Sequence, residues 1–313
     1  MAHPHHAAAL ALALLAPVAL AQDTASEAAA SETITATPSP WSISLSVGTE
    51  YVEGSFADIP GDLNILRFDT DLTISRRIGQ RRNLSLSFSQ ERSFYDFDGA
   101  LGIVPADPAD ADPMSEGQTL GLNATFGGME ASGWGWFVTG GVQWAGEPGA
   151  VFDDSLTVSG GGGVTFQASK GLRLGVGLIA GTRIEESARV IPFPIVEWTI
   201  DKDWSLSAGS RGAGAVLTYK ATPEVTLGLE VGFESREYRL DSDNVFADGV
   251  ILDRAIPLAF TAEWRPNEQV TLAGRVGAHL WGEIEFTDSA GNRLNREDRD
   301  VALLAGVELR FRF

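Results

Sequence analysis

Apolar and polar residues alternate along most of the chain after residue 40, which is the period of a β-strand with two unlike faces. In residues 41–51, Trp41, Ile43, Leu45 and Val47 share one face, and serines and a glycine occupy the other. Similar alternation recurs in residues 66–74, 84–89, 120–126, 134–144, 172–184, 225–233, 270–280 and 301–313. No stretch of useful length has the helical period. The pattern predicts an all-β protein.

Many of these segments are longer than the roughly 5–6 residues of a typical soluble strand. They match the roughly 9–11 residues that a tilted strand needs to cross a membrane. We therefore expect a single transmembrane antiparallel β-barrel over residues 41–313. The alternative is a secreted β-sandwich with its aromatic residues in the core, but its strands would be shorter.

Short and long connections alternate between the segments. The short ones are residues 79–82, 127–133, 168–171, 201–203, 220–224 and 265–268. The longer ones are residues 53–62, 98–117, 147–155, 241–253 and 287–299, and tighter hairpins lie near 185–188 and 211–212. Bacterial barrels have even strand numbers, short periplasmic turns and longer outer loops. The spacing predicts about 14 strands; residues 204–219 form either a short pair or one bent strand, which leaves 12 as the alternative.

The first 40 residues carry a different pattern. Residues 7–21 form an apolar run that ends in Ala19-Leu20-Ala21, typical of a secretory signal peptide over residues 1–21. The preceding residues contain histidines but no Lys or Arg, which departs from that pattern. Residues 22–40 are rich in Ala, Ser, Thr, Glu and Pro, so we expect a disordered periplasmic segment before the barrel.

Composition removes several classes of function. The chain has no cysteine, which excludes disulfides, thiol catalysis and thiolate metal sites. Its formal net charge of −19 argues against nucleic acid as a partner. Acidic residues gather in residues 98–117 and again at Asp241, Asp243, Asp248 and Asp253, so we expect acidic outer loops, which could hold divalent ions that bridge lipopolysaccharide phosphates or serve only as solvated surface. No segment has the ligand spacing of a calcium loop, and we expect neither a metal nor a cofactor.

Aromatic residues lie where the strands meet the predicted connections. Trp41, Trp134, Trp198, Trp204 and Trp264 lie beside short turns or at the start of the first strand. Tyr51, Phe94, Tyr95, Trp144, Tyr238 and Trp281 lie at the opposite ends. Two aromatic girdles flanking an apolar band are typical of a membrane barrel, which implies outer-membrane lipid and lipopolysaccharide as surroundings.

Charged residues share the inward phase of the strands. The predicted lumen-lining residues are Arg173, Arg183, Glu230, Glu234, Glu263, Arg275, His279, Glu308 and Arg310. Buried charges are paired or hydrated, so this set predicts either a network that fills the barrel or the lining of a pore. His279 is the one histidine beyond residue 6, and a lipid-acting hydrolase would need it beside Ser159, Ser205 or Ser207. Nothing in the sequence assigns that pairing, so no catalytic residue is predicted.

Two stretches carry a resemblance to known proteins. Residues 301–313 alternate strictly and end in Phe313, and this resembles the last strand of a bacterial outer-membrane barrel. In such proteins a terminal Phe is the signal for the barrel-insertion machinery, which the resemblance implies as a partner. Residues 189–198, with Pro192 and Pro194 before Trp198 and a polar turn before Trp204, resemble an uncharacterised family of outer-membrane barrel proteins. The resemblance implies the bacterial outer membrane as location and supplies no catalytic residues.

Three functions fit these expectations. The first is a narrow passive channel for small polar or cationic solutes, because barrels between about 8 and 16 strands leave room for a narrow pore. The second is a non-conducting structural or adhesion barrel with a charge-filled lumen. The third is a lipid-acting enzyme that uses His279. The sequence does not determine the solute or the oligomeric state.

Overall fold

The structure is a computed structural model that describes residues 40–98, 113–185, 187–209 and 213–313. The predicted signal peptide, nearly all of the predicted periplasmic segment and most of the acidic connection 98–117 lie outside these residues. The strands are β1 (Trp41–Ser55), β2 (Asp62–Ile78), β3 (Arg82–Asp98), β4 (Glu116–Met129), β5 (Trp134–Gly146), β6 (Leu156–Ser169), β7 (Leu172–Gly181), β8 (Arg189–Thr199), β9 (Trp204–Ala208), β10 (Gly214–Lys220), β11 (Val225–Gly232), β12 (Glu234–Arg239), β13 (Val250–Trp264), β14 (Val270–Thr287), β15 (Arg293–Arg299) and β16 (Ala302–Arg312). A short 3-10 helix, η1, spans Asp153–Ser155.

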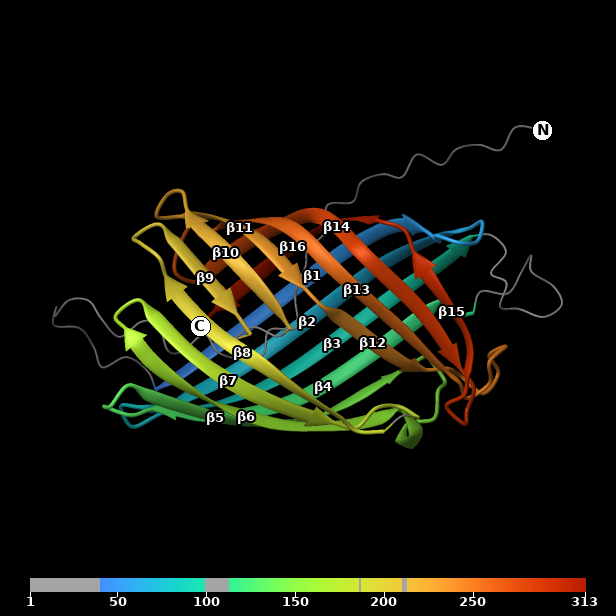
Figure 1. Cartoon of the computed structure of the whole chain (residues 1–313), viewed down its shortest axis with the longest axis horizontal. Coiled ribbons are helices and arrows are strands. Elements are labelled where there is room, and N and C mark those ends of the chain that lie inside the picture. The colour runs from blue at the N-terminus through green and yellow to red at the C-terminus, as the bar shows by residue number, and fades with distance from the viewer. Residues whose placement is uncertain (1–39, 99–112, 186, 210–212) are drawn as a thin grey trace.

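The strands form one closed antiparallel barrel (Figure 1). Neighbours in sequence pair with each other, and β16 pairs with both β14 and β1, which joins the two ends of the sheet. β11 and β12 pair one after the other with β13, and β15 and β16 pair one after the other with β14. These two pairs of segments are each one interrupted strand, so the barrel has 14 strands, as the sequence predicted. Residues 204–219 form the short pair β9 and β10 rather than one bent strand.

The outer surface of the barrel is apolar. Leu174, Val176 and Leu178 of β7 all point outward, and Val176 is 63% exposed. Continuous apolar surface of this kind is unstable in water but matches the hydrocarbon of a bilayer. No described helix is long and apolar enough to cross a membrane. The chain is therefore a transmembrane β-barrel of the bacterial outer-membrane type.

Two predicted outer loops are shorter than expected. Residues 293–299, placed in a loop by the sequence pattern, form β15 and pair with β14. Residues 250–253 belong to β13 instead of the preceding loop. Both strands continue past the apolar band, so alternation between apolar and polar residues no longer marks them.

Small inward side chains line a large part of the wall. On β3, β4 and β6 the residues opposite the lipid-facing ones are mostly serine, threonine and glycine, as with Ser85, Gly121 and Gly161. At the end where the long connections lie, an apolar cluster fills the interior instead. It contains Val52, Ile65, Tyr95, Tyr238, Leu240, Ile251, Ile284 and Phe286 among others. The barrel is thus lined by small groups in one half and packed in the other.

Candidate functional site

β12 is the element that brings the site together, because it leaves the wall of the barrel. It pairs with β13 on one edge, and Arg239 at its end forms a parallel bridge with Gly146 of β5. The Tyr238 hydroxyl lies 3.1 Å from the Ser93 hydroxyl and 2.9 Å from Glu91, both on β3. β3 and β5 lie on the far side of the ring from β11, so β12 crosses the interior and contacts the opposite wall.

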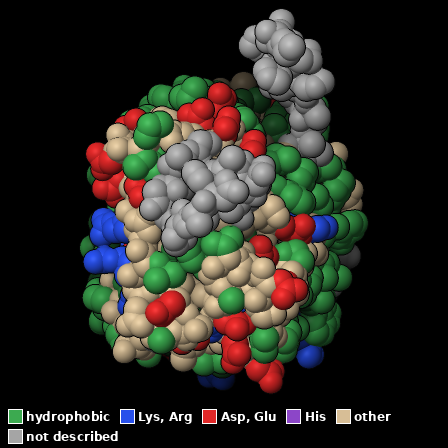
Figure 2. Space-filling view, turned by 90° about the vertical axis from the view of Figure 1, so that its right-hand side faces the viewer, with side chains coloured by type: hydrophobic (Ala, Val, Ile, Leu, Met, Phe, Trp, Pro, Cys, Tyr) green, Lys and Arg blue, Asp and Glu red, His purple; other side chains and the backbone are tan. Residues whose placement is uncertain are grey.

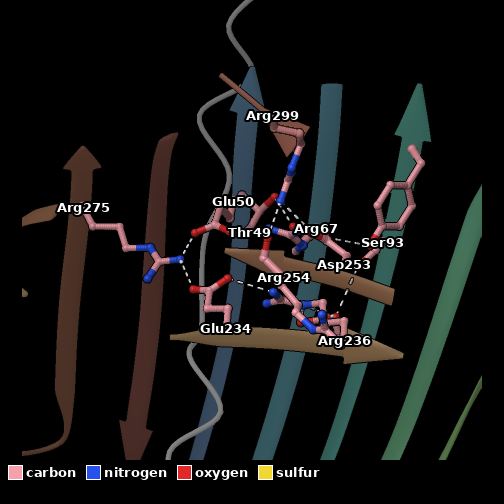
Figure 3. Close-up of polar contacts among 12 residues, drawn as sticks. Thr49, Glu50, Arg67, Ser93, Glu234, Arg236, Asp253, Arg254, Arg275 and Arg299 are labelled. Atoms are coloured by element: carbon pink, nitrogen blue, oxygen red, sulfur yellow. Dashed lines mark hydrogen bonds and ion pairs between the residues drawn. The ribbon is translucent and has the colours of Figure 1, made fainter. Parts of the chain in front are cut away.

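A buried ionic network forms where β12 and β13 meet β1 and β2 (Figure 3). Arg67 of β2 donates from Nη1 to Glu50 of β1 at 2.9 Å and from Nη2 to Asp253 of β13 at 2.7 Å. Arg299 of β15 donates to the other oxygen of Asp253, also at 2.7 Å. The side chains of these four residues are at most 3% exposed. The network joins β1 and β2, near the start of the barrel sequence, to β13 and β15, near its end.

A second part of the network fixes β12 itself. Arg236 donates from Nε to Glu91 on β3 at 2.9 Å and from Nη1 to Glu234 at 2.7 Å. Glu283 of β14 accepts from Arg254 at 2.7 Å and lies 2.6 Å from Arg296 of β15. Every one of these carboxylates contacts at least one guanidinium, which offsets the cost of removing the charges from water.

Together the network and the apolar cluster block the axis of the barrel. Phe286 and Tyr238 are 0% exposed, and both lie in the apolar cluster with Val52 of β1 and Ile65 of β2. Figure 2 views this end of the barrel, and Asp and Glu are scattered over the part of the face that the grey atoms leave visible. Of the two outcomes that the sequence left open for the inward charges, the described residues form the packed network in this half.

The predicted lumen residues divide between the two halves. Glu234, Arg275 and His279 lie in or beside the network, where Arg275 pairs with Glu50 and lies 3.7 Å from Glu234. The others face inward elsewhere: Arg173 pairs with Glu197, Arg183 with Glu237, Glu263 with Arg265 and Glu308 with Arg310, while Glu230 faces the interior from β11. The structure therefore brings three of the predicted residues together and keeps six apart from them.

His279 is buried and has no hydrogen-bond partner at either ring nitrogen among the described residues. Neither nitrogen contacts a serine hydroxyl, so the arrangement that a Ser–His hydrolase needs is not formed here. Ligand atoms of His279, Glu50 and Glu234 lie within 4.8 Å of one another, a grouping that could hold a metal ion. Arg275 contacts both carboxylates, so a guanidinium already supplies the positive charge at that position.

The aromatic residues separate into two groups. Trp41, Trp134, Trp198, Trp204 and Trp264 are all 40–53% exposed at the end of the barrel with the short turns. Tyr95 and Tyr238, expected in the opposite girdle, instead lie in the apolar cluster, so that expectation was wrong. Asp253 was expected on an acidic loop and is instead buried in the network, because β13 extends further than its pattern indicated.

Phe313 follows β16 and is exposed, and its backbone exchanges hydrogen bonds with Ile43 at 2.8 and 3.2 Å. Its role as an assembly signal stays a prediction. The acidic residues Asp241 and Asp243 lie in the connection between β12 and β13, as expected for that outer loop.

Comparisons with known proteins add the following. No family model matches the chain, and no characterised sequence matches it. An outer-membrane channel of Pseudomonas putida F1, described as COG4313, is 12% identical with a TM-score of 0.46 over 89% of this chain and 97% of its own. A mutant of the TodX monoaromatic hydrocarbon channel is 7% identical, with a TM-score of 0.44 over 88% and 91%. A FadL homologue of Pseudomonas aeruginosa is 10% identical, with a TM-score of 0.44 over 87% and 90%. Likenesses this weak carry no argument about the function of this chain.

Proposed function

We propose that the protein is a passive channel of the bacterial outer membrane for small polar solutes, with a preference for cations. The observation that carries the proposal is the lining of β3, β4 and β6, where most inward side chains are serine, threonine or glycine. The rings of Phe137 and Phe193 lie over Gly163 and Gly177, so the free space is narrower than the glycines alone indicate. Barrels of about eight strands have filled interiors, and those of about 16 strands hold an aqueous channel. A barrel of 14 strands therefore has the width for a narrow pore.

The packed half decides the state of this channel. The ionic network and the apolar cluster occupy the axis, so the conformation described is closed at that end. Conduction requires β12 and the connection that follows it to move away from β1 to β3. The proposal thus describes a channel that opens rarely without a stimulus.

Acidic side chains support the preference for cations. Glu230, Glu263 and Glu308 face the interior. Arg265 and Arg310 pair with two of these three carboxylates, so the set keeps a small negative excess, and an acidic excess in a lining enriches cations. This field weakens as salt shortens the Debye length to about 3 Å at 1 M. The preference for cations over anions should therefore fall as the ionic strength rises.

Conductance of the refolded protein in planar bilayers tests the proposal. We expect infrequent openings in the native protein and more frequent ones in Asp253→Ala, which removes the link between β13 and β2. Reversal potentials in a salt gradient should show cation preference that Glu230→Gln reduces more than Asp243→Asn, because only the former side chain faces the interior. A reversal potential that shows preference for anions would refute the negative charge assigned to the lining.

The second candidate function is a non-conducting structural barrel, which the closed axis favours. Absence of current in both the native protein and Asp253→Ala, with both proteins folded, would establish that alternative over the channel.

A further inference from the structure

The wall of the barrel is incomplete beside β8. β8 pairs with β7 from Arg189 to Trp198, but it pairs with β9 only from Val196 to Thr199. β9 has 5 residues and β10 has 7, so this hairpin covers a fraction of the length of the neighbouring strands (Figure 1). Within the described part of the chain, no strand pairs with residues 189–195 on the side of β9. Among the described residues, the outer half of this strand thus has no strand partner on that side, although Gly209 lies against the Pro194 carbonyl.

Two prolines help to keep that edge unpaired. Pro192 and Pro194 lie within the free part of β8, opposite Leu178 and Val176 of β7. Proline has no N–H group, so it fits a strand only where its nitrogen does not have to donate to a neighbour. Another strand that aligned here would lack two ladder hydrogen bonds. The sequence therefore disfavours closure of the wall at this point.

β12 borders the opening on its other side, because it leaves the wall of the barrel. β11 ends at Gly232, and β12 turns into the interior instead of continuing the wall. Behind the opening lies a cavity of about 220 Å³. Its lining includes Val158, Ile179, Arg183, Arg189, Ile191 and Glu237. Arg183 and Glu237 pair with each other, which connects the segment before β8 to β12.

Side-chain exposure agrees with an opening at this place. Val190 points to the lipid side, because its partner in β7 is Ala180, and it is 58% exposed. Ile191 points the opposite way, lines the cavity and is still 37% exposed. Consecutive residues of a strand lie on opposite faces. Both faces of β8 are therefore accessible here, as expected at the rim of a gap in the wall.

The lining has an apolar part and a positive part. Ile179 and Ile191 supply apolar contacts, and the charged residues of the lining are two arginines and one glutamate. Glu237 is engaged by Arg183, whereas no described acidic group pairs with Arg189. The cavity is smaller than the roughly 300–1,000 Å³ of sites for drug-sized ligands. Its chemistry suits a small molecule with an apolar body and a negative group.

We propose that the opening between β8 and β12 is the mouth of a binding site for a small amphipathic carboxylate. The apolar body lies against Ile179 and Ile191, and the carboxylate accepts hydrogen bonds from Arg189. The site goes beyond the proposed channel, because it opens through the wall and requires no current along the axis. A solute that reaches it enters from the side of the barrel.

Thiol protection tests the site, because the chain has no cysteine and a single introduced thiol reports one position. The protein with Ile191→Cys, in lipid nanodiscs, is treated with a maleimide in the presence of 4-phenylbutyrate, 4-phenylbutanol or 4-phenylbutylamine. We expect the acid to slow the reaction most, since the three probes share one apolar body. A Ser87→Cys protein, altered on β3 away from the cavity, should react at the same rate with and without the probes.

Direct binding of 4-phenylbutyrate, measured by calorimetry in nanodiscs, supplies the second test. Arg189→Gln should weaken binding roughly tenfold or more, the loss expected for one charge-assisted hydrogen bond. Arg265→Gln removes an arginine from a short turn and should leave binding unchanged. Ile191→Trp fills the cavity and should abolish binding, whereas Val190→Trp places the same bulk in the lipid and should not.

The outcomes separate this site from the channel. Stronger protection by the amine than by the acid would overturn the assigned charge, and no binding by the folded native protein would overturn the site. Equal loss of binding in Val190→Trp and Ile191→Trp would show that the cavity is not the place of binding. Conductance measured on the same Ile191→Trp protein should persist, so a channel without this site, or a site without a channel, can each be recognised.

Discussion

Replacement of Asp253 by asparagine should destabilise the barrel more than any exposed charge substitution. Asp253 accepts from Arg67 and Arg299, both at 2.7 Å, and from the Tyr95 hydroxyl at 3.1 Å. Asparagine keeps the size of the side chain but presents an NH₂ group to one of the two arginines. It therefore replaces one hydrogen bond by a contact between two donors and leaves two buried positive charges with less compensation.

The magnitude follows from burial. Both side chains of the Arg67–Asp253 pair are at most 2% exposed. Removal of one partner from a buried pair costs roughly 3–5 kcal/mol, because the other charge stays out of water. With a urea dependence of about 1–3 kcal/mol per molar, this loss lowers the unfolding midpoint by at least about 1 M.

The assay is urea unfolding of the protein in lipid vesicles, followed by the fluorescence of its 8 tryptophans and by heat-modifiable gel mobility. Glu263→Gln is the matched control, because Glu263 pairs with Arg265, which is 56% exposed. That exposed pair should contribute about 0–1 kcal/mol to the free energy of unfolding. Equal midpoints for Asp253→Asn and Glu263→Gln would refute the conclusion that the buried network stabilises the packed half.

Three further predictions concern the turns and loops. An epitope inserted at Asn244 should be labelled on intact cells, and one at Asn267 should not, since the first lies on a long connection and the second on a short turn; the reverse result would invert the topology. Gly209 has a φ of 71° and lies against the Pro194 carbonyl, so Gly209→Ala should lower the free energy of unfolding by about 1–3 kcal/mol, while Gly140→Ala, with 3.6 Å of room, should not. Backbone N–H groups hold the pKa of Asp201 below its ordinary value of 3.8, so the contribution of that turn to stability is present above the unfolded pKa and is lost as the pH falls through the lowered one. A carboxyl-carbon NMR titration with a midpoint at or above 3.8 would contradict this.

The strands were predictable wherever lipid contacts one face. Leu174, Val176 and Leu178 must be apolar because they meet the bilayer, while the intervening residues face the interior. This requirement imposes the period of two residues that the sequence shows. The number of strands followed from the same pattern together with the connections.

The inward course of β12 was missed, although the sequence contains a signal for it. After Phe233 the lipid-facing phase continues with Ser235, Glu237 and Arg239, none of which suits hydrocarbon. The segment has the alternation of a strand but the wrong residues for the lipid side of one. β15 shows the same feature, with charge or amide groups at both phases from residue 295 to 299. A test for polar residues in the outward phase would have identified both segments.

The partners of the buried charges were not predictable. Arg67 and Asp253 are separated by 186 residues, and their contact depends on the path of β12 and β13 across the interior. A single sequence shows which residues face inward but not which of them meet. For the same reason the sequence left open whether the inward charges form a pore or a network.

The two possible openings of this barrel differ in the interactions that they require to break. An axial path must separate β12 and β13 from β1 to β3, which exposes at least two independent groups, Arg67 with Asp253 and Arg236 with Glu91. Opening along the axis also exposes the apolar cluster around Val52, Ile65 and Phe286 to water, which is unfavourable. Among the described residues, the gap beside β8 has no ladder hydrogen bonds to break between residues 189 and 195. A solute therefore reaches the interior of this conformation more readily through the wall than along the axis, and the thiol at position 191 should react faster than one placed in the packed half at Tyr238.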